Sequence, residues 1–223
     1  MKTTIYLLAA LLLITFSSCK KDADVATAKF SVKQKTTTLK STQIGTFTFS
    51  KANIGISEIE FEMEFESGTD DYELEVEYEG PFQFDVLTGT STPAVIAIEI
   101  TPGTYHELEF DIESVLSTGN SIEISGTYDD GNGNSYQFEF TSNFEDDYEI
   151  ENVAGIDVSI GQTTNFVLQL DLPLLFVGVD FSSAVMGNDN IIRINSSSNQ
   201  NLASIIENNL DNIMDVDDDN DDD

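Results

Sequence analysis

Glutamates alternate with apolar residues in two neighbouring segments of this chain. The first segment covers residues 59–66, the second covers residues 72–79, and a turn-forming linker at 67–71 separates them. Because successive side chains of a strand point to opposite faces, each segment predicts a half-buried strand with its glutamates on the solvent side. The glutamates of these two files are Glu60, Glu62, Glu64, Glu66, Glu73, Glu75, Glu77 and Glu79.

The linker favours a hairpin, in which Glu66 is expected opposite Glu73 and Glu60 opposite Glu79. Like charges that lie directly opposite each other destabilise a strand pair. Water and salt, Ca²⁺ or a cationic partner must therefore offset the repulsion. Alternatively, the glutamates form only a solvated face that prevents edge-to-edge aggregation.

Two further groups of side-chain oxygens have the alternating spacing that opens many calcium loops. These groups are Asp215, Asp217 and Asp219 near the end of the chain, and Asp130, Asn132 and Asn134 in a turn-like segment. Both lack the glycine at position six and the glutamate at position twelve of a complete loop. We therefore expect at most weak Ca²⁺ binding, and the sequence suggests no other cofactor.

The residue types give little support for catalysis. His106 is the only histidine and Cys19 the only cysteine, so a nucleophilic triad depends on His106. A single histidine also cannot build a usual catalytic zinc site. We expect His106 to lie at the edge of the core and the protein not to be an enzyme. A two-carboxylate hydrolase is the last-ranked alternative, because 41 acidic residues make any pair available.

The start of the chain has the features of an export signal. A lysine precedes an apolar stretch at residues 5–14, which is too short to span a membrane. Residues 16–19, Phe-Ser-Ser-Cys, resemble the lipobox that lipoprotein signal peptidase reads, with Phe where Leu is commonest. The resemblance implies that residues 1–18 are removed and that acyl chains on Cys19 hold the protein to a membrane.

The three residues after Cys19 are Lys20, Lys21 and Asp22. They resemble the charged export signal of Bacteroidota-type surface lipoproteins. This resemblance implies a lipid-anchored protein of the outer membrane that faces the cell exterior, with the periplasmic face as the alternative.

Charge is distributed unevenly along the chain. Seven of the nine lysines and arginines lie between Lys20 and Lys51, only Arg193 follows, and the formal net charge is −32. A body of this kind repels polyanions, which excludes nucleic acid as a partner. With Cys19 lipidated, no disulfide can form, so core packing alone must stabilise the fold.

A period of two continues from about residue 45 to residue 181 and predicts many short strands. Beyond the two glutamate segments, strands are expected at 81–87, 94–100, 105–112, 122–128, 135–144, 163–172 and 174–181. Alternation places Tyr105 on the solvent side with the glutamates of its strand. Residues 101–103, Thr-Pro-Gly, favour a type II turn, and residues 129–133 favour a hairpin loop with positive φ.

These elements predict an all-β protein, an antiparallel β-sandwich of Ig-like or transthyretin-like type. An amphipathic helix is expected at 200–214. The expected organisation is a signal peptide at 1–18, a lipidated basic tether at 19–43 with an edge strand at 28–32, the sandwich at 44–182, a loop and the helix at 183–214, and an acidic disordered tail at 215–223.

Two stretches, EGPFQFDVL at 79–87 and ITPGTYHELEFDI at 100–112, resemble uncharacterised β-sandwich domains of such lipoproteins. The resemblance implies a fold more than an activity. We expect a non-catalytic binding or adhesion module with an unknown protein or glycan partner. The alternative is a structural or assembly component that anchors a fibre by strand addition at a free edge.

Overall fold

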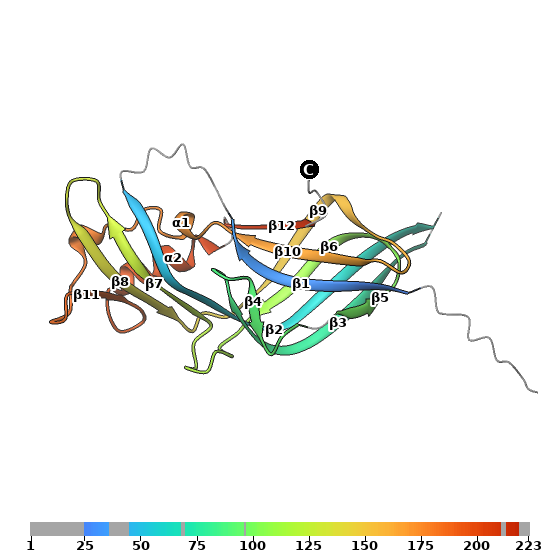
Figure 1. Ribbon diagram of the computed structural model, residues 1–223, viewed down its shortest axis with the longest axis horizontal. Helices are drawn as coiled ribbons and strands as arrows, with labels where there is room; N and C mark the ends of the chain where they lie inside the picture. The colour runs from blue at the N-terminus through green and yellow to red at the C-terminus, as the bar shows by residue number, and fades with distance from the viewer. Residues whose placement is uncertain (1–24, 36–44, 68–69, 96, 211–212, 219–223) are drawn as a thin grey trace, which may run out of the picture.

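The computed structural model describes residues 25–35, 45–67, 70–95, 97–210 and 213–218. Within these ranges the chain folds into strands that run along an elongated body, with two short α-helices and the 3₁₀ helix η1 (Phe181–Ser183) in one half of it (Figure 1). No helix in the described ranges is long and apolar enough to cross a membrane.

Four strands form the first sheet, in the order β12–β10–β1–β5. Their bounds are β1 (Ala26–Gln34), β5 (Ile98–Ile100), β10 (Thr163–Leu170) and β12 (Met214–Asp218). β1 lies parallel to β10 on one side and antiparallel to β5 on the other, and β12 is antiparallel to β10. β1 is therefore an internal strand of this sheet.

The second sheet is organised by β2 (Thr46–Ser67), a strand of 22 residues that runs through both halves of the body (Figure 1). One edge of β2 pairs first with β7 and then with β6, and its other edge pairs with β3. The remaining strands extend from these partners. Their bounds are β3 (Asp70–Asp85), β4 (Thr90–Thr92), β6 (Gly103–Ile112), β7 (Ile122–Asp129), β8 (Ser135–Ser142), β9 (Asp146–Val158) and β11 (Ile191–Ile194).

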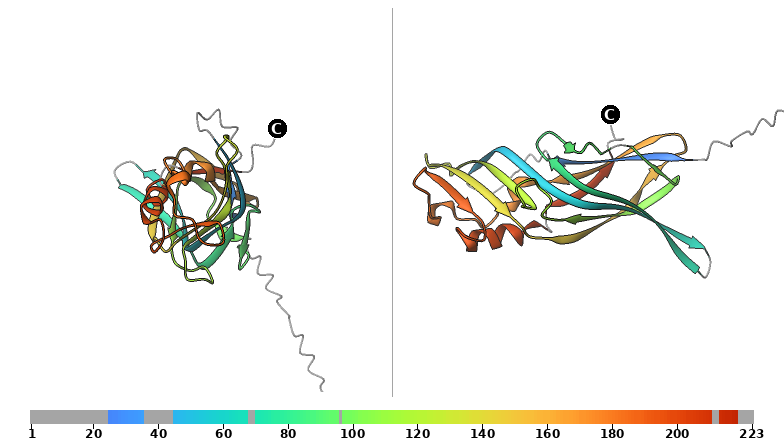
Figure 2. Two further views of the ribbon diagram at one scale, coloured as in Figure 1. Left: turned by 90° about the vertical axis from the view of Figure 1, so that its left-hand side faces the viewer. Right: turned by 90° about the horizontal axis from the view of Figure 1, so that it is seen from below.

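One half of the molecule is a sandwich, in which the β9–β6–β2–β3 part of the second sheet packs on the first sheet. Phe61 of β2 and Phe166 of β10 meet between the layers with ring centroids 4.7 Å apart. In the other half, the β11–β8–β7–β2 part is covered on its inner side by α1 (Leu172–Leu175) and α2 (Gln200–Glu207) (Figure 2). There the ring of Phe138 in β8 packs against the ring of Phe176, just after α1, with ring centroids 5.0 Å apart.

Two bulges keep one face of β2 apolar from Phe47 to Met63. The pairing register shifts between Phe49 and Lys51 and again between Ile56 and Glu58. Each bulge adds one residue, Ser50 or Ser57, and so reverses the alternation once. The inward side chains of β2 are therefore Phe47, Phe49, Ala52, Ile54, Ile56, Ile59, Phe61 and Met63.

The expected all-β sandwich with a C-terminal helix is confirmed, but its sheets are mixed rather than antiparallel, because β1 is parallel to β10 and β11 is parallel to β8. Several elements also differ from expectation. The predicted edge strand at 28–32 is the internal strand β1, although it lies in the segment expected to be a tether. The segment 81–87 is mostly the continuation of β3, and only three residues of 94–100 form a strand.

The apolar run 174–181 was predicted to be a strand, and this is wrong. The run follows Pro173, which favours the first turn of a helix, and the short helix α1 and turns occupy it. Leu172, Leu175 and Phe176 are buried there at helical spacing. Short apolar runs of this kind do not distinguish a buried strand from a buried helix.

The C-terminal segment also differs from expectation. The predicted loop 183–198 contains β11, and the helix ends at Glu207 rather than near 214. Asp215 and Asp217 lie in β12, whose backbone pairs with β10, so this part of the expected disordered tail is an ordered strand. Asp219 lies outside the described residues.

The expected type II turn at 101–103 is also wrong, because Gly103 does not adopt a positive φ. Gly103 begins β6 and packs closely on β2, where a Cβ atom at this position would lie 2.3 Å from the Met63 sulfur. The loop at 129–133 does contain the expected positive φ, at Gly131 and Gly133.

Candidate functional site

Carboxylates cover the outer face of the β9–β6–β2–β3 part of the second sheet in three rows of four. The pairing registers align one acidic residue from each strand in every row. From β3 to β9, the rows are Glu75–Glu62–Glu107–Glu151, Glu77–Glu60–Glu109–Glu149 and Glu79–Glu58–Asp111–Asp147. We call these twelve residues the acidic array.

The local sequence fixes the array, because each of the four strands alternates acidic with apolar residues. On β2 and β6 the residues between the acids are Ile59, Phe61, Leu108 and Phe110, all 0–1% exposed in the core. A slip of one residue in any strand exchanges its two faces and buries the carboxylates. The apolar face therefore holds the rows in register.

The hairpin register differs from the predicted one by two residues. Glu64 lies opposite Glu73 and Glu60 opposite Glu77, because Asp70 and Asp71 continue the ladder and pair with Ser67 and Glu66. Only residues 68 and 69 remain between the strands. Because a shift of two residues preserves the alternation, Glu60, Glu62, Glu75, Glu77 and Glu79 still lie on the predicted face.

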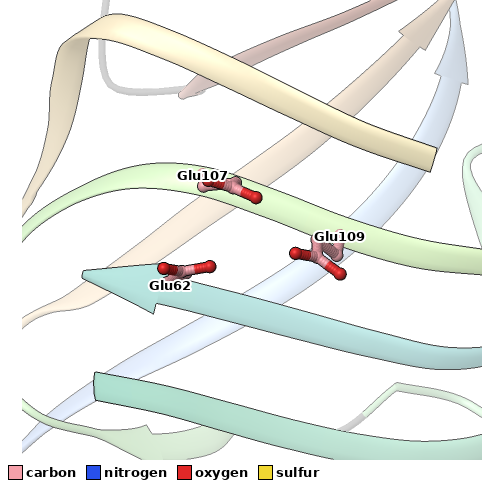
Figure 3. Close-up of side chains that lie close together, drawn as sticks. All are labelled: Glu62, Glu107 and Glu109. Carbon is pink, nitrogen blue, oxygen red and sulfur yellow. The ribbon is translucent and has the colours of Figure 1, made fainter. Parts of the chain in front are cut away.

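Three members of the array come close enough to share a cation. Carboxylate oxygens of Glu62, Glu107 and Glu109 all lie within 4.8 Å of one another (Figure 3). Two oxygens that each bind Ca²⁺ at 2.3–2.6 Å are at most about 5 Å apart, so this spacing suits a hard divalent cation. Glu62 is also the most enclosed, at 9% exposure.

Crowding within the array favours the protonated forms of its central members. Burial, followed by the charges of Glu109, Glu75 and Glu77, raises the pKa of Glu60 to about 7. Burial, followed by a hydrogen bond with Glu109 and the charge of Glu62, raises the pKa of Glu107 to about 8. The face therefore takes up protons near neutral pH unless cations replace them.

The basic residues of these strands do not supply that compensation. β3, β6 and β9 contain no lysine or arginine, and β2 contains only Lys51. Lys51 pairs with Glu123, and Arg193 of β11 pairs with Glu139 and Asp189. In these ion pairs, neither Lys51 nor Arg193 is paired with a member of the array.

The other predicted sites stay separate from the array. Asp130 receives hydrogen bonds from its own loop: its Oδ1 accepts from the backbone N–H groups of Asn132 and Asn134, and its Oδ2 accepts from the Asn134 side chain. These bonds close the loop and lower the pKa of Asp130. The proposed calcium sites at this loop and at Asp215 and Asp217 stay predictions, and Cys19 to Asp22 lie outside the described residues.

Tyr105 was expected on the solvent side, and this is wrong because the alternation of β6 is interrupted between Tyr105 and Leu108, which are both buried. The register with β9 shifts here, because β6 advances by two residues from Tyr105 to Glu107 while β9 advances by five from Ile156 to Glu151. Tyr105 is 1% exposed, and its hydroxyl donates to the Thr101 carbonyl at 2.9 Å. His106 is half-buried beside it.

Sequence reasoning identified only the β2–β3 part of the array. The members on β6 and β9, together with Glu58 of β2, were missed. They are Glu58, Glu107, Glu109, Asp111, Asp147, Glu149 and Glu151. Their signal is the same acid–apolar alternation at 107–111 and 147–151, which identifies the face but not the neighbouring strand.

The fold and this face define an all-β sandwich protein with a densely acidic sheet surface. The chain belongs to a family characterised by a domain of unknown function (DUF4382), whose model matches residues 42–186. All four strands of the array lie within that segment, whereas β1, β11, α2 and β12 lie outside it. The comparison with curated proteins and the one with solved structures found no match.

Proposed function

We propose that this chain is a lipid-anchored, non-catalytic binding module of the outer membrane surface, and that its acidic array binds divalent cations such as Ca²⁺. The three rows of four carboxylates are the observation that carries the proposal. Like charges at neighbouring positions of a sheet are destabilising, and divalent cations between the rows remove that cost.

Bound cations give the face a means of contacting a partner. Ca²⁺ takes six to eight oxygen ligands, and Glu62, Glu107 and Glu109 offer one oxygen each within the observed cluster. The remaining coordination positions are open to water or to carboxylate, hydroxyl or carbonyl oxygens of a protein or glycan. The array then acts as an adhesive surface whose strength depends on the cation concentration.

The titration of the array with Ca²⁺ tests this proposal. The unlipidated Cys19→Ser chain is freed of metal with EDTA, and its melting temperature is measured with Ca²⁺, Mg²⁺ or K⁺. A cation at 100 times its Kd stabilises the folded state by about 2.7 kcal/mol. For a chain of this size that corresponds to roughly 5–11 °C.

Two matched variants complete the experiment. Glutamine at Glu60, Glu62, Glu107 and Glu109 is expected to abolish the Ca²⁺ shift. The control neutralises four exposed acids elsewhere and is expected to keep it. Its members are Glu99, Asp129, Glu145 and Asp157. A Ca²⁺ shift that is absent in the parent chain, or is equal in both variants, contradicts the proposal.

The anchor has a separate test. Lipidation of Cys19 is supported by the resemblance of residues 16–19 to a lipobox, and export to the exterior by Lys20, Lys21 and Asp22. Cys19→Ser is expected to abolish labelling with radioactive palmitate and to release the protein from the membrane fraction. Labelling that persists in this variant rules out Cys19 as the acylated residue.

An assembly role by strand addition is the alternative function, and it requires an open sheet edge. The outer edge of β11 is already occupied by its own loops. The Gly187 N–H donates to the Ile191 carbonyl at 2.9 Å, and the Asn199 side chain donates to the Arg193 carbonyl at 2.7 Å. At the β11 edge, these loops therefore oppose strand addition.

A further inference from the structure

The side chains on the outer face of the second sheet change in type along β2. Next to the acidic array, the part built from the start of β2, β7 and β8 presents mainly hydroxyl and amide side chains. They are Thr46, Thr48, Ser50, Ser125, Thr127, Ser135, Gln137 and Thr141. Such a neutral surface is unexpected in a chain with 41 acidic residues and a net charge of −32.

A hollow of about 340 Å³ lies on this part of the face. We call it the polar hollow, and its side-chain lining comes from Ser50, Ser125, Thr127, Gln137, Glu139 and Ile191. Its volume falls in the lower part of the range of small-molecule sites, about 300–1,000 Å³.

The first bulge of β2 shapes the polar hollow. Ser50 is the added residue, and its hydroxyl lies 3.2 Å from both the carbonyl and the hydroxyl oxygen of Ser125. Gly126 stands opposite the bulge, where a Cβ atom would lie 2.3 Å from the Thr48 carbonyl oxygen. The backbone around the hollow is therefore held by the fold.

Most of the hydrogen-bonding side chains of the lining are uncharged. Within the described residues, the Thr127 hydroxyl and the Gln137 amide make no side-chain hydrogen bond, so donors and acceptors of both groups face solvent. The Glu139 carboxylate lies 3.2 Å from Arg193 Nε, and it shares this cation with Asp189. Ile191 adds a half-buried apolar side chain to the wall.

We infer that the polar hollow binds an uncharged carbohydrate. Sugar hydroxyls donate and accept hydrogen bonds, which matches hydroxyl and amide groups, and the C–H face of a sugar ring matches Ile191. The strongly negative field of the chain repels anionic glycans, and free cations are drawn to the acidic array. A neutral polyhydroxylated ligand is thus the class that this lining selects.

The position of the hollow suits a surface receptor. It lies beside β11, at the end of the body away from the start of β1 (Figure 1). If the chain is held at Cys19, the hollow lies at the end of the body opposite to the start of the first strand after the anchor.

Affinity electrophoresis of the Cys19→Ser chain tests the inference. The gels contain neutral dextran, laminarin or xylan, or anionic alginate, and EDTA is present throughout so that cation binding at the array does not contribute. At least one neutral polysaccharide is expected to retard the protein, and alginate is not. Retardation by alginate alone, or by none of the four, overturns the inference.

Variants then locate the site. Thr127→Val with Gln137→Ala is expected to weaken the binding at least 10-fold, and Gln137→Arg, which fills the hollow, does the same if the double variant is unstable. The matched control is Gln162→Ala with Thr163→Val, an exposed pair at the start of β10 that is expected to bind normally. Retardation that is unchanged in both hollow variants overturns the assignment.

Discussion

The placement of β1 inside the first sheet leads to a quantitative prediction about Phe30. Its side chain is 4% exposed, and its ring packs edge-to-face on Phe84 of β3 at a centroid distance of 5.5 Å. Phe30→Ala removes this ring from the space between the two sheets. If residues 26–34 were a solvated tether, the substitution would have almost no effect.

The expected cost follows from burial and from the neighbours. Substitutions of buried Phe by Ala cost about 3–5 kcal/mol, depending on how well the site can collapse. The adjacent inward residues of β1 are Ala28 and Val32, which are too small to fill the space. We therefore expect a loss of about 4 kcal/mol, in the middle of that range.

Urea unfolding of the Cys19→Ser chain measures this loss. With a slope of about 2 kcal/mol per molar urea, the midpoint falls by about 2 M. The melting temperature falls by roughly 8–16 °C. Lys29→Ala is the control, because Lys29 is exposed on the same strand and such changes stay within about 0.5 kcal/mol. A loss below about 1 kcal/mol for Phe30→Ala would refute the position of β1 in the core.

Three other predictions concern charge and packing. Without divalent cations, the free energy of unfolding is expected to rise as the pH falls from 8.5 to 6. The pKa values of Glu60 and Glu107 are raised to about 7 and about 8 in the folded state. In this pH range the folded state therefore binds protons that the unfolded state does not bind. Urea unfolding at both pH values checks this, and the Glu60→Gln, Glu107→Gln double variant is expected to lose most of the dependence. Lys51→Ala removes the cation beside the Glu123 carboxylate, which is only 8% exposed; the expected cost is about 1.5–3 kcal/mol by urea unfolding, and no change would contradict the pairing. Gly126→Ala is expected to lower the melting temperature by overpacking against the β2 backbone, at a cost of about 1–3 kcal/mol, whereas an unchanged value would show that the bulge can move.

The strands and their faces could be predicted because the side-chain period is two. Ile59, Phe61 and Met63 alternate with glutamates, and the structure places the two sets on opposite faces as expected. Registers were harder to predict, because they depend on the number of residues in the turn. Asp70 and Asp71 have typical turn composition, yet they extend the ladder.

Bulges were the second source of error. One extra residue reverses the alternation, and no composition signal marks Ser57 as that residue or the segment 105–107 as the place where the register with β9 is irregular. For this reason Tyr105 was assigned to the wrong face. For the same reason, the sequence did not show that β2 is one continuous strand. Its two bulges make the inward residues change from odd to even numbers and back.

The rows of the array depend on pairing between distant parts of the chain. Glu60 and Glu109 are neighbours only because β2 pairs with β6, and Glu149 joins them only through β9. Similarly, the aspartates of β12 suggested disorder from their charge, but pairing of the β12 backbone with β10 orders this strand. Side-chain composition does not show which backbone hydrogen bonds a segment makes.

The parallel alignment of β1 with β10 has a mechanical consequence. If the protein is held at Cys19, drag on the body is transmitted into the domain through the first residue of β1, along the strand axis. Eight residue pairs join β1 to β10, so tension loads these backbone bonds together in shear rather than peeling them one by one. The connection between anchor and domain is then strongest in the direction in which a surface protein bound to its partner is pulled.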